Sequence, residues 1–361
     1  MKKLLFALLP IAIIGCQKEQ QTSDNTIFLT EDNMPAPDTL YLEKVDLNEK
    51  ILEAYTYVYD GLYLSINYKA PDPYFVTVTD KNNNVVAEYY KKGEGPNEFV
   101  GIGSQLHNNF LHIYDPTVNR IARMDIDSIV LQKYDYHPQI TTIRPNLTRG
   151  YAYTSDSTIT AFNVWFLDGY NIDPNVPEYI RINTATGKCD STSINSTYFT
   201  CGVTGGQLMY NTETKTYIMT YNRKPQIDIL DENLNLIKSY VGPEPNDIEF
   251  ETSYGNNLHE TKGNVSYFHE ASTMSQNNFF VRNARIYKTQ RSEYHKNSQQ
   301  LYSENQEIWR FNKTGDFINR YKFPNAMGEL FAPSYCEETK TLYVNGYDED
   351  GELGLYKCTL K

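Results

Sequence analysis

A strand–turn–strand pattern recurs along this chain of 361 residues, and the recurrence constrains the fold more than any other feature. The two clearest copies are PYFVTVTDKNNNVVAEYYKKGEGPNEF (residues 73–99) and PQIDILDENLNLIKSYVGPEPNDIEF (residues 225–250). Each contains an alternating apolar strand, an acidic turn, a second strand ending in tyrosine, and then Gly, Pro-Asn and Glu-Phe. A third copy is EIWRFNKTGDFINRYKFP (residues 307–324). The turn residue and the closing tyrosine are nine residues apart in all three copies: Asp80 and Tyr89, Asp231 and Tyr240, Asn312 and Tyr321.

A fourth copy is LHIYDPTVNRIARM, with Asp115 and Met124 at the same interval, and a weaker fifth is EYIRINTATGKCDST, centred on Asn183. Asp or Asn opens such a turn because its side chain can bond to the following backbone amides. Asn83 and Gly315, inside two of the turns, tolerate a positive φ. One hairpin cannot bury its own faces, but several four-stranded units arranged about an axis can. The pattern therefore predicts an all-β chain folded as a β-propeller.

The repeat indicates four-stranded blades, but the spacing of its turns leaves the number of blades open. The anchors at 80, 115, 183, 231 and 312 are uneven, and two wide gaps have room for a degenerate blade or long loops. Six blades of four antiparallel strands over residues 38–361 would average about 54 residues each, near the length of known blade repeats. Seven short blades are the first alternative, and a pair of β-sandwiches is the second. Residues 39–45 are expected to close the ring against residues 354–360.

Composition supports a β-sheet fold and argues against binding to nucleic acid. The chain has 31 Tyr, 16 Phe and 2 Trp, and aromatic residues suit a pleated, half-buried surface. The alternative role for so many tyrosines is a surface that stacks on carbohydrate. The net charge of −12 lacks the basic excess that a polyanion-binding face needs.

The N-terminus has the form of an export signal. MKKLLFALLPIAIIGC begins with two lysines, continues with a short apolar run and ends in Gly15-Cys16. The apolar run is too short for a permanent span and fits a signal peptide. Ile13 to Cys16 resembles the lipobox of bacterial lipoproteins, which implies that Cys16 is acylated after removal of residues 1–15. An ordinary signal peptide with an incidental cysteine is the alternative.

The remaining sequence divides accordingly. Residues 16–37 are expected to be a lipidated flexible tether, and residues 38–361 the propeller domain. Lys18-Glu19 after the cysteine is similar to the export signal of surface lipoproteins in Bacteroidetes. These features imply an outer-membrane lipoprotein of the cell envelope, with the surface favoured over the periplasmic face.

Four cysteines follow Cys16, and none has zinc-binding spacing. Cys189 and Cys201 flank a short polar loop and could form a disulfide. Cys336 and Cys358 fall in the outer two strands of a predicted three-stranded meander, about 9–10 Å apart, which is too far for a disulfide. The pairing of the four is left open, with small buried side chains as the default.

The stretch KKGEGPNEF (residues 91–99) could be either a phosphate cradle or a turn. A phosphate cradle needs a helix N-terminus after the glycines. Here Pro-Asn-Glu-Phe follows, no amphipathic helix is indicated, and Glu94 and Glu98 would repel phosphate. We interpret the stretch as a crossover between blades, with Phe99 buried under the next one.

The same stretch also carries a family resemblance. KGEGPNEF after a strand, an Asp turn and a second strand resembles the G-x-G-P-x-E-F signature of six-bladed, TolB-like or NHL-like propeller lipoproteins of Bacteroidetes. Residues 308–324 and 330–358 are similar to the final blade of that family. The resemblance covers most of residues 38–361, and the family is largely uncharacterised. Copy two departs from it, because Val241-Gly242-Pro243 replaces the two-glycine form and Ile248 is inserted.

No motif assigns a catalytic, cofactor-binding or metal-binding residue. Of six histidines, His107 and His112 are five apart, which on a single strand would put them on opposite faces. The run from Asp348 to Glu352 lacks the ligand spacing of a calcium loop and is expected to be an acidic hairpin turn. The run from Asp168 to Asp173 is expected to be a solvated loop, with a surface metal as the alternative.

These observations favour a non-catalytic, lipid-anchored binding or scaffold module for a protein, peptide or glycan, with no cofactor. The alternative is a metal-assisted, lactonase-like hydrolase with its site at the central channel. Such sites take one residue from each blade, so spacing along the chain cannot reveal them. The repeat-anchor acids Glu98, Asp115, Asp231 and Glu249 could be mistaken for such a ring, and we expect turn roles for them. A sensory role in the envelope is a third possibility.

Overall fold

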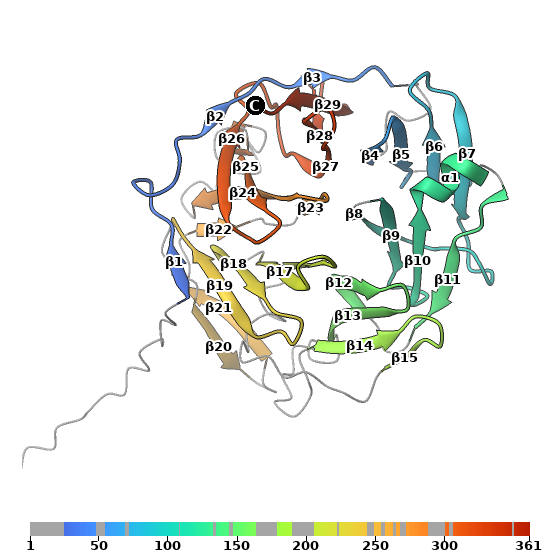
Figure 1. Ribbon diagram of the computed structural model, residues 1–361, viewed down its shortest axis with the longest axis horizontal. Coiled ribbons are helices and arrows are strands. Elements are labelled where there is room, and N and C mark those ends of the chain that lie inside the picture. The colour runs from blue at the N-terminus through green and yellow to red at the C-terminus, as the bar shows by residue number, and fades with distance from the viewer. Residues whose placement is uncertain are drawn as a thin grey trace, which may run out of the picture.

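The protein is a disc of β-strands arranged around a central axis (Figure 1). The computed structural model describes residues 25–47, 55–68, 72–107, 109–132, 135–143, 147–163, 179–189, 206–221, 224–243, 249–253, 257–262, 265–267, 272–287, 300–302, 306–348 and 350–361. A short helix, α1 (Ile126–Gln132), lies at the rim. The expected β-propeller is confirmed.

Each blade is an antiparallel group of four strands, and the blades are named A to F in chain order. Blade A contains β4 (Tyr55–Tyr59), β5 (Leu62–Ile66), β6 (Tyr74–Thr79) and β7 (Val85–Lys91). Blade B contains β8 (Gly103–His107), β9 (Phe110–Asp115), β10 (Arg120–Asp125) and β11 (Gln139–Thr142). Blade C contains β12 (Leu147–Ser155), β13 (Thr158–Asn163), β14 (Tyr179–Asn183) and β15 (Lys188–Cys189).

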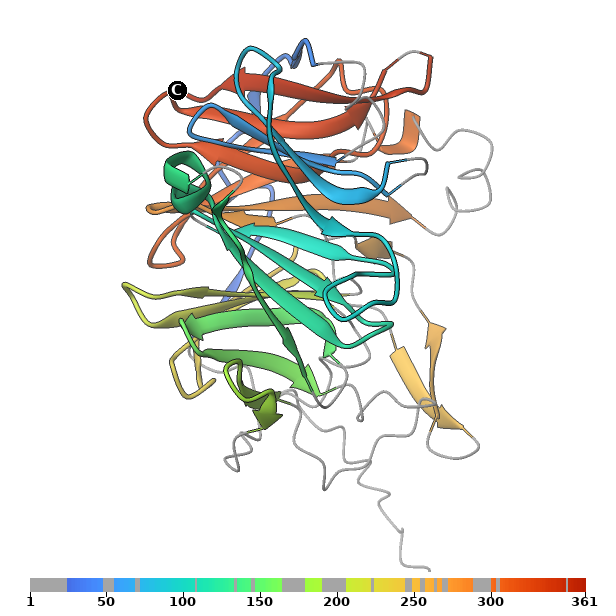
Figure 2. The ribbon, with the colours of Figure 1, turned by 90° about the vertical axis from the view of Figure 1, so that its right-hand side faces the viewer.

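The second half of the ring follows the same plan. Blade D contains β16 (Gly206–Asn211), β17 (Thr216–Tyr221), β18 (Gln226–Leu230) and β19 (Leu236–Val241). Blade E contains β23 (Ser272–Met274), β24 (Asn278–Tyr287), β25 (Gln306–Asn312) and β26 (Phe317–Lys322), with β22 (Val265–Tyr267) beside β24. Blade F contains β27 (Phe331–Cys336), β28 (Thr341–Tyr347), β29 (Leu353–Thr359) and β3 (Glu43–Lys44). In each blade the first strand lies nearest the axis, and the blades fan out through the depth of the disc (Figure 2).

The N-terminal segment, residues 25–46, runs along the outside of three blades as a strap (Figure 1). Its β1 (Thr26–Phe28) pairs in parallel with β19, and its β2 (Asp38–Thr39) pairs in parallel with β26. Its β3 pairs antiparallel with β29, so the expected closure of residues 39–45 against 354–360 is confirmed. The folded, described part of the chain thus already includes residues 25–37, which the sequence had assigned to the tether.

Polar side chains of blade E and of the following loop hold the strap in place. Arg320, which is 4% exposed, donates to the Pro35 carbonyl at 2.8 Å and to Glu31 at 2.7 Å. Asn325 bonds both backbone groups of Leu42, at 3.0 and 2.8 Å. Gly242 (φ 113°) lets the strap pass close to the end of β19, because a Cβ at this position would lie 2.5 Å from the carbonyl oxygen of Leu29.

The turns follow the chemistry expected from the repeat. Asp80 Oδ1 accepts bonds from the backbone amides of Asn82 and Asn84 at 2.8 and 2.9 Å. Asp231 and Asn312 accept the matching pairs of amides in their own turns. Inside the turns, Asn83 has φ 63° and Gly315 has φ 81°. Asp348 makes the same kind of turn between β28 and β29, so the acidic hairpin at 348–352 is confirmed.

One repeat assignment is wrong. The turns at Asp80, Asn183, Asp231 and Asn312 join the third and fourth strands of their blades, whereas Asp115 ends the second strand of blade B. In that blade, α1 stands between the third and fourth strands. The interval from Asp115 to Met124 matched by coincidence, because any short hairpin between two six-residue strands has a similar length. This displacement accounts for part of the uneven spacing of the anchors.

Residues 92–102 form the crossover from blade A to blade B, as interpreted from GEGPNEF. Phe99 is completely buried. Asp115 Oδ2 accepts the backbone amide of Val100 at 2.6 Å, and Arg120 donates to the carbonyl of Gly95 at 2.7 Å. The crossover is therefore fastened to blade B by side chains of that blade, and no helix follows it.

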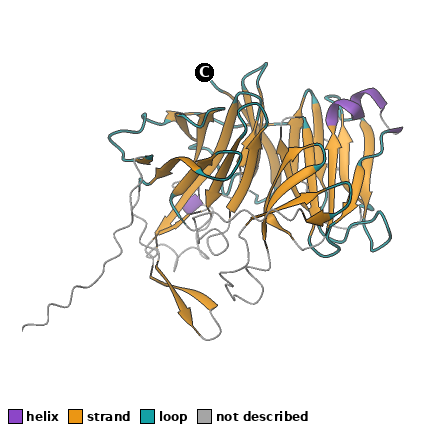
Figure 3. Cartoon of the chain, turned by 60° about the horizontal axis from the view of Figure 1, so that its bottom comes forward, coloured by secondary structure: helices purple, strands orange, loops and turns teal. Residues whose placement is uncertain are grey.

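Two details complete the architecture. The hairpin β20 (Glu249–Ser253) and β21 (Asn257–Lys262) projects from the ring as a separate two-stranded sheet (Figure 3). Cys336 and Cys358 carry free thiols in β27 and β29, as their separation predicted. Cys201 and the run from Asp168 to Asp173, expected to be a solvated loop, lie outside the described residues.

Candidate functional site

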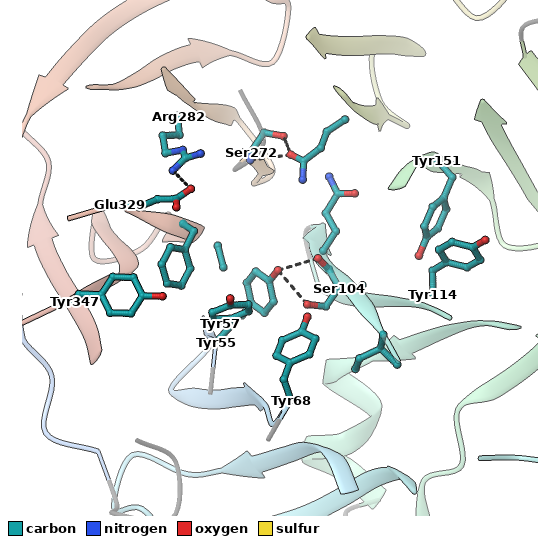
Figure 4. Close-up of a pocket in the computed structure, with 16 residues that line it drawn as sticks. Tyr55, Tyr57, Tyr68, Ser104, Tyr114, Tyr151, Ser272, Arg282, Glu329 and Tyr347 are labelled. Atoms are coloured by element: carbon teal, nitrogen blue, oxygen red, sulfur yellow. Dashed lines mark hydrogen bonds and ion pairs between the residues drawn. The ribbon is translucent and has the colours of Figure 1, made fainter. Parts of the chain in front are cut away.

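A cavity of about 420 Å³ lies on the axis, and every blade contributes to its wall (Figure 4). Because aromatic rings dominate this wall, we call it the tyrosine cavity. Its lining residues are Tyr55, Tyr57, Tyr68, Ile102, Gly103, Ser104, Gln105, Tyr114, Tyr151, Gln207, Ser272, Arg282, Glu329, Phe331, Ala332 and Tyr347.

A second cavity, of about 500 Å³, lies at the other end of the inner strands. The beginnings of β4, β8, β16, β23 and β27 line the tyrosine cavity, and their ends or the turns that follow line the second one. Its described lining includes four acids and no Lys or Arg, so we call it the acidic cavity. Its lining residues are Tyr59, Asp60, Leu106, Asn109, Asn211, Thr212, Glu213, Thr273, Met274, Ser275, Gln276, Tyr335, Cys336, Glu337 and Glu338.

The two cavities are separated where the inner strands of blades B and E meet on the axis. His107 of β8 and Met274 of β23 form a parallel bridge, and the Thr273 hydroxyl donates to the Leu106 carbonyl at 3.2 Å. Gln105 and Ser272, one step earlier on the two strands, face the tyrosine cavity. The contact thus forms a floor between the two cavities.

Two aromatic groups make up most of the wall of the tyrosine cavity. Tyr55 lies 5.0 Å from Tyr68 and 4.7 Å from Phe331, and Phe331 lies 5.8 Å from Tyr347, measured between ring centroids. These rings form a continuous surface across the boundary of blades A and F. Tyr114 and Tyr151, 5.8 Å apart, belong to blades B and C on the opposite side (Figure 4).

Polar groups of the wall are partly paired within the protein. The Tyr57 hydroxyl donates to the Ser104 carbonyl at 3.0 Å, and the Ser272 amide donates to Gln207 at 2.9 Å. Arg282 forms an ion pair with Glu329 and donates to the Leu330 carbonyl at 3.0 Å. Arg282 and Glu329 are the two charged residues among the described lining, so the wall is close to neutral.

Two buried nitrogen atoms at this wall have no partner among the described residues. Gln105 is 8% exposed and its Nε2 is unpaired, and Arg282 is 1% exposed with an unpaired Nε. A buried donor without an acceptor costs about 1–3 kcal/mol. Buried polar groups nearly always find a partner, so these two donors indicate an acceptor that the chain itself does not supply.

The phenol groups of the cavity are protonated at neutral pH, as ordinary tyrosines are. Burial raises the pKa of Tyr57 and of Tyr151 further, well above the ordinary value for tyrosine. At neutral pH these hydroxyls can therefore both donate and accept hydrogen bonds.

The expectation for His107 and His112 is wrong. The two residues are not on one strand: His107 ends β8, and His112 lies in β9, the antiparallel partner of β8. Their rings stand edge to face with centroids 5.7 Å apart, and both side chains are buried. Desolvation lowers the pKa of His107 to about 4 and lowers the pKa of His112 as well.

The repeat-anchor acids do not line either cavity. Asp231 has the turn role that was expected, and Asp115 caps its own turn while holding the crossover. Glu98 accepts the amide of Gly95 at 2.9 Å, and Glu249 is in β20, off the ring. Across the part of the chain that the structure describes, no group of three or more His, Cys, Asp or Glu could hold a metal ion.

Sequence reasoning did not find the cavity residues. Gln105, Arg282 and Tyr151 come from different blades, and nothing in their spacing along the chain relates them. The one available signal was the excess of tyrosine. Cys16, the predicted lipidation site, lies outside the described residues.

Comparison with solved structures shows the same fold in proteins of Bacteroides. A member of the DUF4221 family from Bacteroides vulgatus is 14% identical, with a TM-score of 0.51, covering 90% of this chain and 94% of its own. A protein of Bacteroides fragilis described as exported is 12% identical, with a TM-score of 0.52, covering 93% and 99%. No family model matches the chain, and no curated protein matches it. Among the described residues no helix has the length and apolarity to cross a bilayer. The chain is thus similar in fold to these propeller proteins of Bacteroides.

Proposed function

We propose that this protein is a non-catalytic binding module whose ligand occupies the tyrosine cavity. The observation that carries the proposal is the pair of unpaired, buried donors on Gln105 and Arg282 within an aromatic wall. Ligand sites in proteins are mostly apolar cavities of about 300–1,000 Å³ with a few well-placed polar groups. The tyrosine cavity has this composition and size.

The proposal includes six blades and a lipid anchor. Four-stranded groups A to F support the six-bladed form of the ring. Acylation of Cys16 would hold the module at the outer membrane, exposed at the surface. The Bacteroides fragilis protein of similar fold is described as exported, which supports a location outside the cytoplasm.

Lipidation is tested by metabolic labelling with a clickable palmitate analogue. We expect label on the wild-type protein and none on Cys16→Ser, which should also leave the membrane fraction. Cys336→Ser, which changes a free thiol of β27, is the matched control and should keep both the label and the membrane location. Labelled Cys16→Ser would contradict the anchor.

Ligand binding is tested by native mass spectrometry of full-length protein purified from native envelopes. We expect a bound mass that is retained in Gln139→Leu, an exposed glutamine on β11, and lost in Gln105→Leu. A ligand-free wild type that hydrolyses a panel of lactones would overturn the proposal in favour of the hydrolase alternative.

A further inference from the structure

We propose that the ligand of the tyrosine cavity is a neutral saccharide. This inference rests on the proposed function and adds the chemical class of the ligand. Three properties of the described wall carry it: its charge balance, its unpaired donors and the placement of its rings.

Charge argues against an ionic ligand. The described wall carries Arg282 and Glu329, which neutralise each other at the boundary of blades E and F. An acidic ligand would have to displace Glu329 and would approach a protein of net charge −12. A basic ligand would need a carboxylate of the wall, and the one described there, Glu329, is already paired with Arg282. A neutral ligand needs neither exchange.

The unpaired donors call for oxygen acceptors. Gln105 on blade B and Arg282 on blade E both present N–H groups without a partner among the described residues. The Tyr57 hydroxyl, which donates to the Ser104 carbonyl, can accept a hydrogen bond, and the Tyr151 hydroxyl can donate or accept one. Sugar hydroxyls have the same dual character, so one polyol can satisfy fixed N–H donors and adaptable phenols together.

The rings supply the remaining contact. Tyr55, Tyr68 and Phe331 form one aromatic surface, and Tyr114 and Tyr151 form another on the opposite side (Figure 4). A pyranose ring has apolar C–H faces and hydroxyls around its edge. It can pack its faces against the rings while its edge reaches the donors, in keeping with the amphipathic use of aromatic side chains. A neutral peptide also carries acceptors, and it is the competing ligand in the test.

The experiment is isothermal titration of full-length protein in detergent with three matched panels: neutral oligosaccharides, uronic-acid oligosaccharides and neutral peptides. We expect binding by members of the neutral saccharide panel. Gln105→Leu should weaken that binding about tenfold through loss of the N–H donor. Tyr68→Leu, at a partly exposed ring, should weaken it several-fold.

Two control variants place the effect in the cavity. Gln139→Leu and Tyr41→Leu change exposed residues outside the tyrosine cavity and should leave affinity unchanged. Because Gln105→Leu places a branched side chain at a buried position, Gln105→Met, an unbranched change that also removes the N–H donor, serves as the second test. Binding of peptides or uronic acids in the cavity, without neutral saccharides, would overturn this inference and leave the proposed binding function intact. No binding from any panel would overturn the inference.

Discussion

The two ends of the axis have the same position in the fold and use their polar groups differently. In the acidic cavity, carboxylates fasten neighbouring blades: Glu337 of blade F accepts bonds from Ser275, Asn277 and Asn278 of blade E at 2.6 to 3.0 Å. In the tyrosine cavity, Gln105 and Arg282 keep nitrogen atoms unpaired within the described structure. This difference favours the tyrosine end for the proposed ligand, because its polar groups are not all used to hold the blades together.

The largest expected effect comes from the crossovers at the tyrosine end. Phe99→Ala removes a fully buried ring and should lower the free energy of unfolding by about 4 kcal/mol through lost burial and a residual cavity. Chemical denaturation measures this. Val100→Ala, at a neighbour that is 42% exposed, is the control and should change little. Equal effects of the two variants would show that the crossover does not fix this end of the disc.

A smaller effect is expected from acid, through the histidine pair in the wall of blade B. The pKa of His107 falls from an ordinary value near 6.5 to about 4 on folding, so the unfolded chain binds more protons below pH 6.5. Stability should fall from about pH 6.5 and level off below about pH 4, a loss of about 3 kcal/mol for this residue. Denaturation across pH should show a flatter profile for His107→Leu.

The control for the acid effect is His137→Leu, which changes an exposed histidine and should keep the wild-type profile. A His107→Leu protein with an unchanged profile would mean that other groups produce the acid sensitivity.

The next effect in size is expected from loss of the Glu337 hydrogen bonds that join blades E and F at the acidic cavity. Glu337→Ala strands three donors, two of them on buried residues, and should cost about 2 kcal/mol of unfolding free energy. Glu338→Ala, at the exposed neighbour, should cost little. Ligand affinity at the tyrosine cavity should be the same in both variants. If Glu337→Ala lowered affinity without loss of stability, the distinction between the two ends would fail.

The smallest effect is expected at the rim of the acidic cavity. Glu213 pairs with Lys313 at 2.7 Å, and the two side chains are 60% and 35% exposed. Exposed ion pairs contribute about 0–1 kcal/mol, so Glu213→Gln should lie within that range in the same denaturation assay. A loss as large as that of Glu337→Ala would show that the rim also holds the blades together.

The sequence predicted the fold from local chemistry. The Asx turns at Asp80 and Asp231, the crossover at Phe99 and the closing strand at Glu43–Lys44 each depend on a few neighbouring residues, and each is confirmed. Prediction failed where two strands had to be distinguished from one, as with His107 and His112, because only two residues separate β8 from β9 in the sequence.

The site could not be predicted for a different reason. Residues of the tyrosine cavity are related by the rotation of the blades about the axis, and that relation has no constant interval in a chain whose blades differ in length. Gln105 and Arg282 also have no unusual neighbours in sequence. Only the closed ring places them together.

The strap bears on how the molecule is made. Its strands β1, β2 and β3 pair with β19, β26 and β29. The strap can therefore complete its pairing only after those later strands have been synthesised. Contacts between such distant parts of a chain form slowly, because the entropy cost of closing a long loop comes before the contacts can stabilise the fold. An N-terminus attached to a membrane during that wait would keep an incomplete ring near the bilayer, so release of a finished disc would depend on the final strand. Deletion of residues from β29 should then destabilise blade F and the N-terminal strap together.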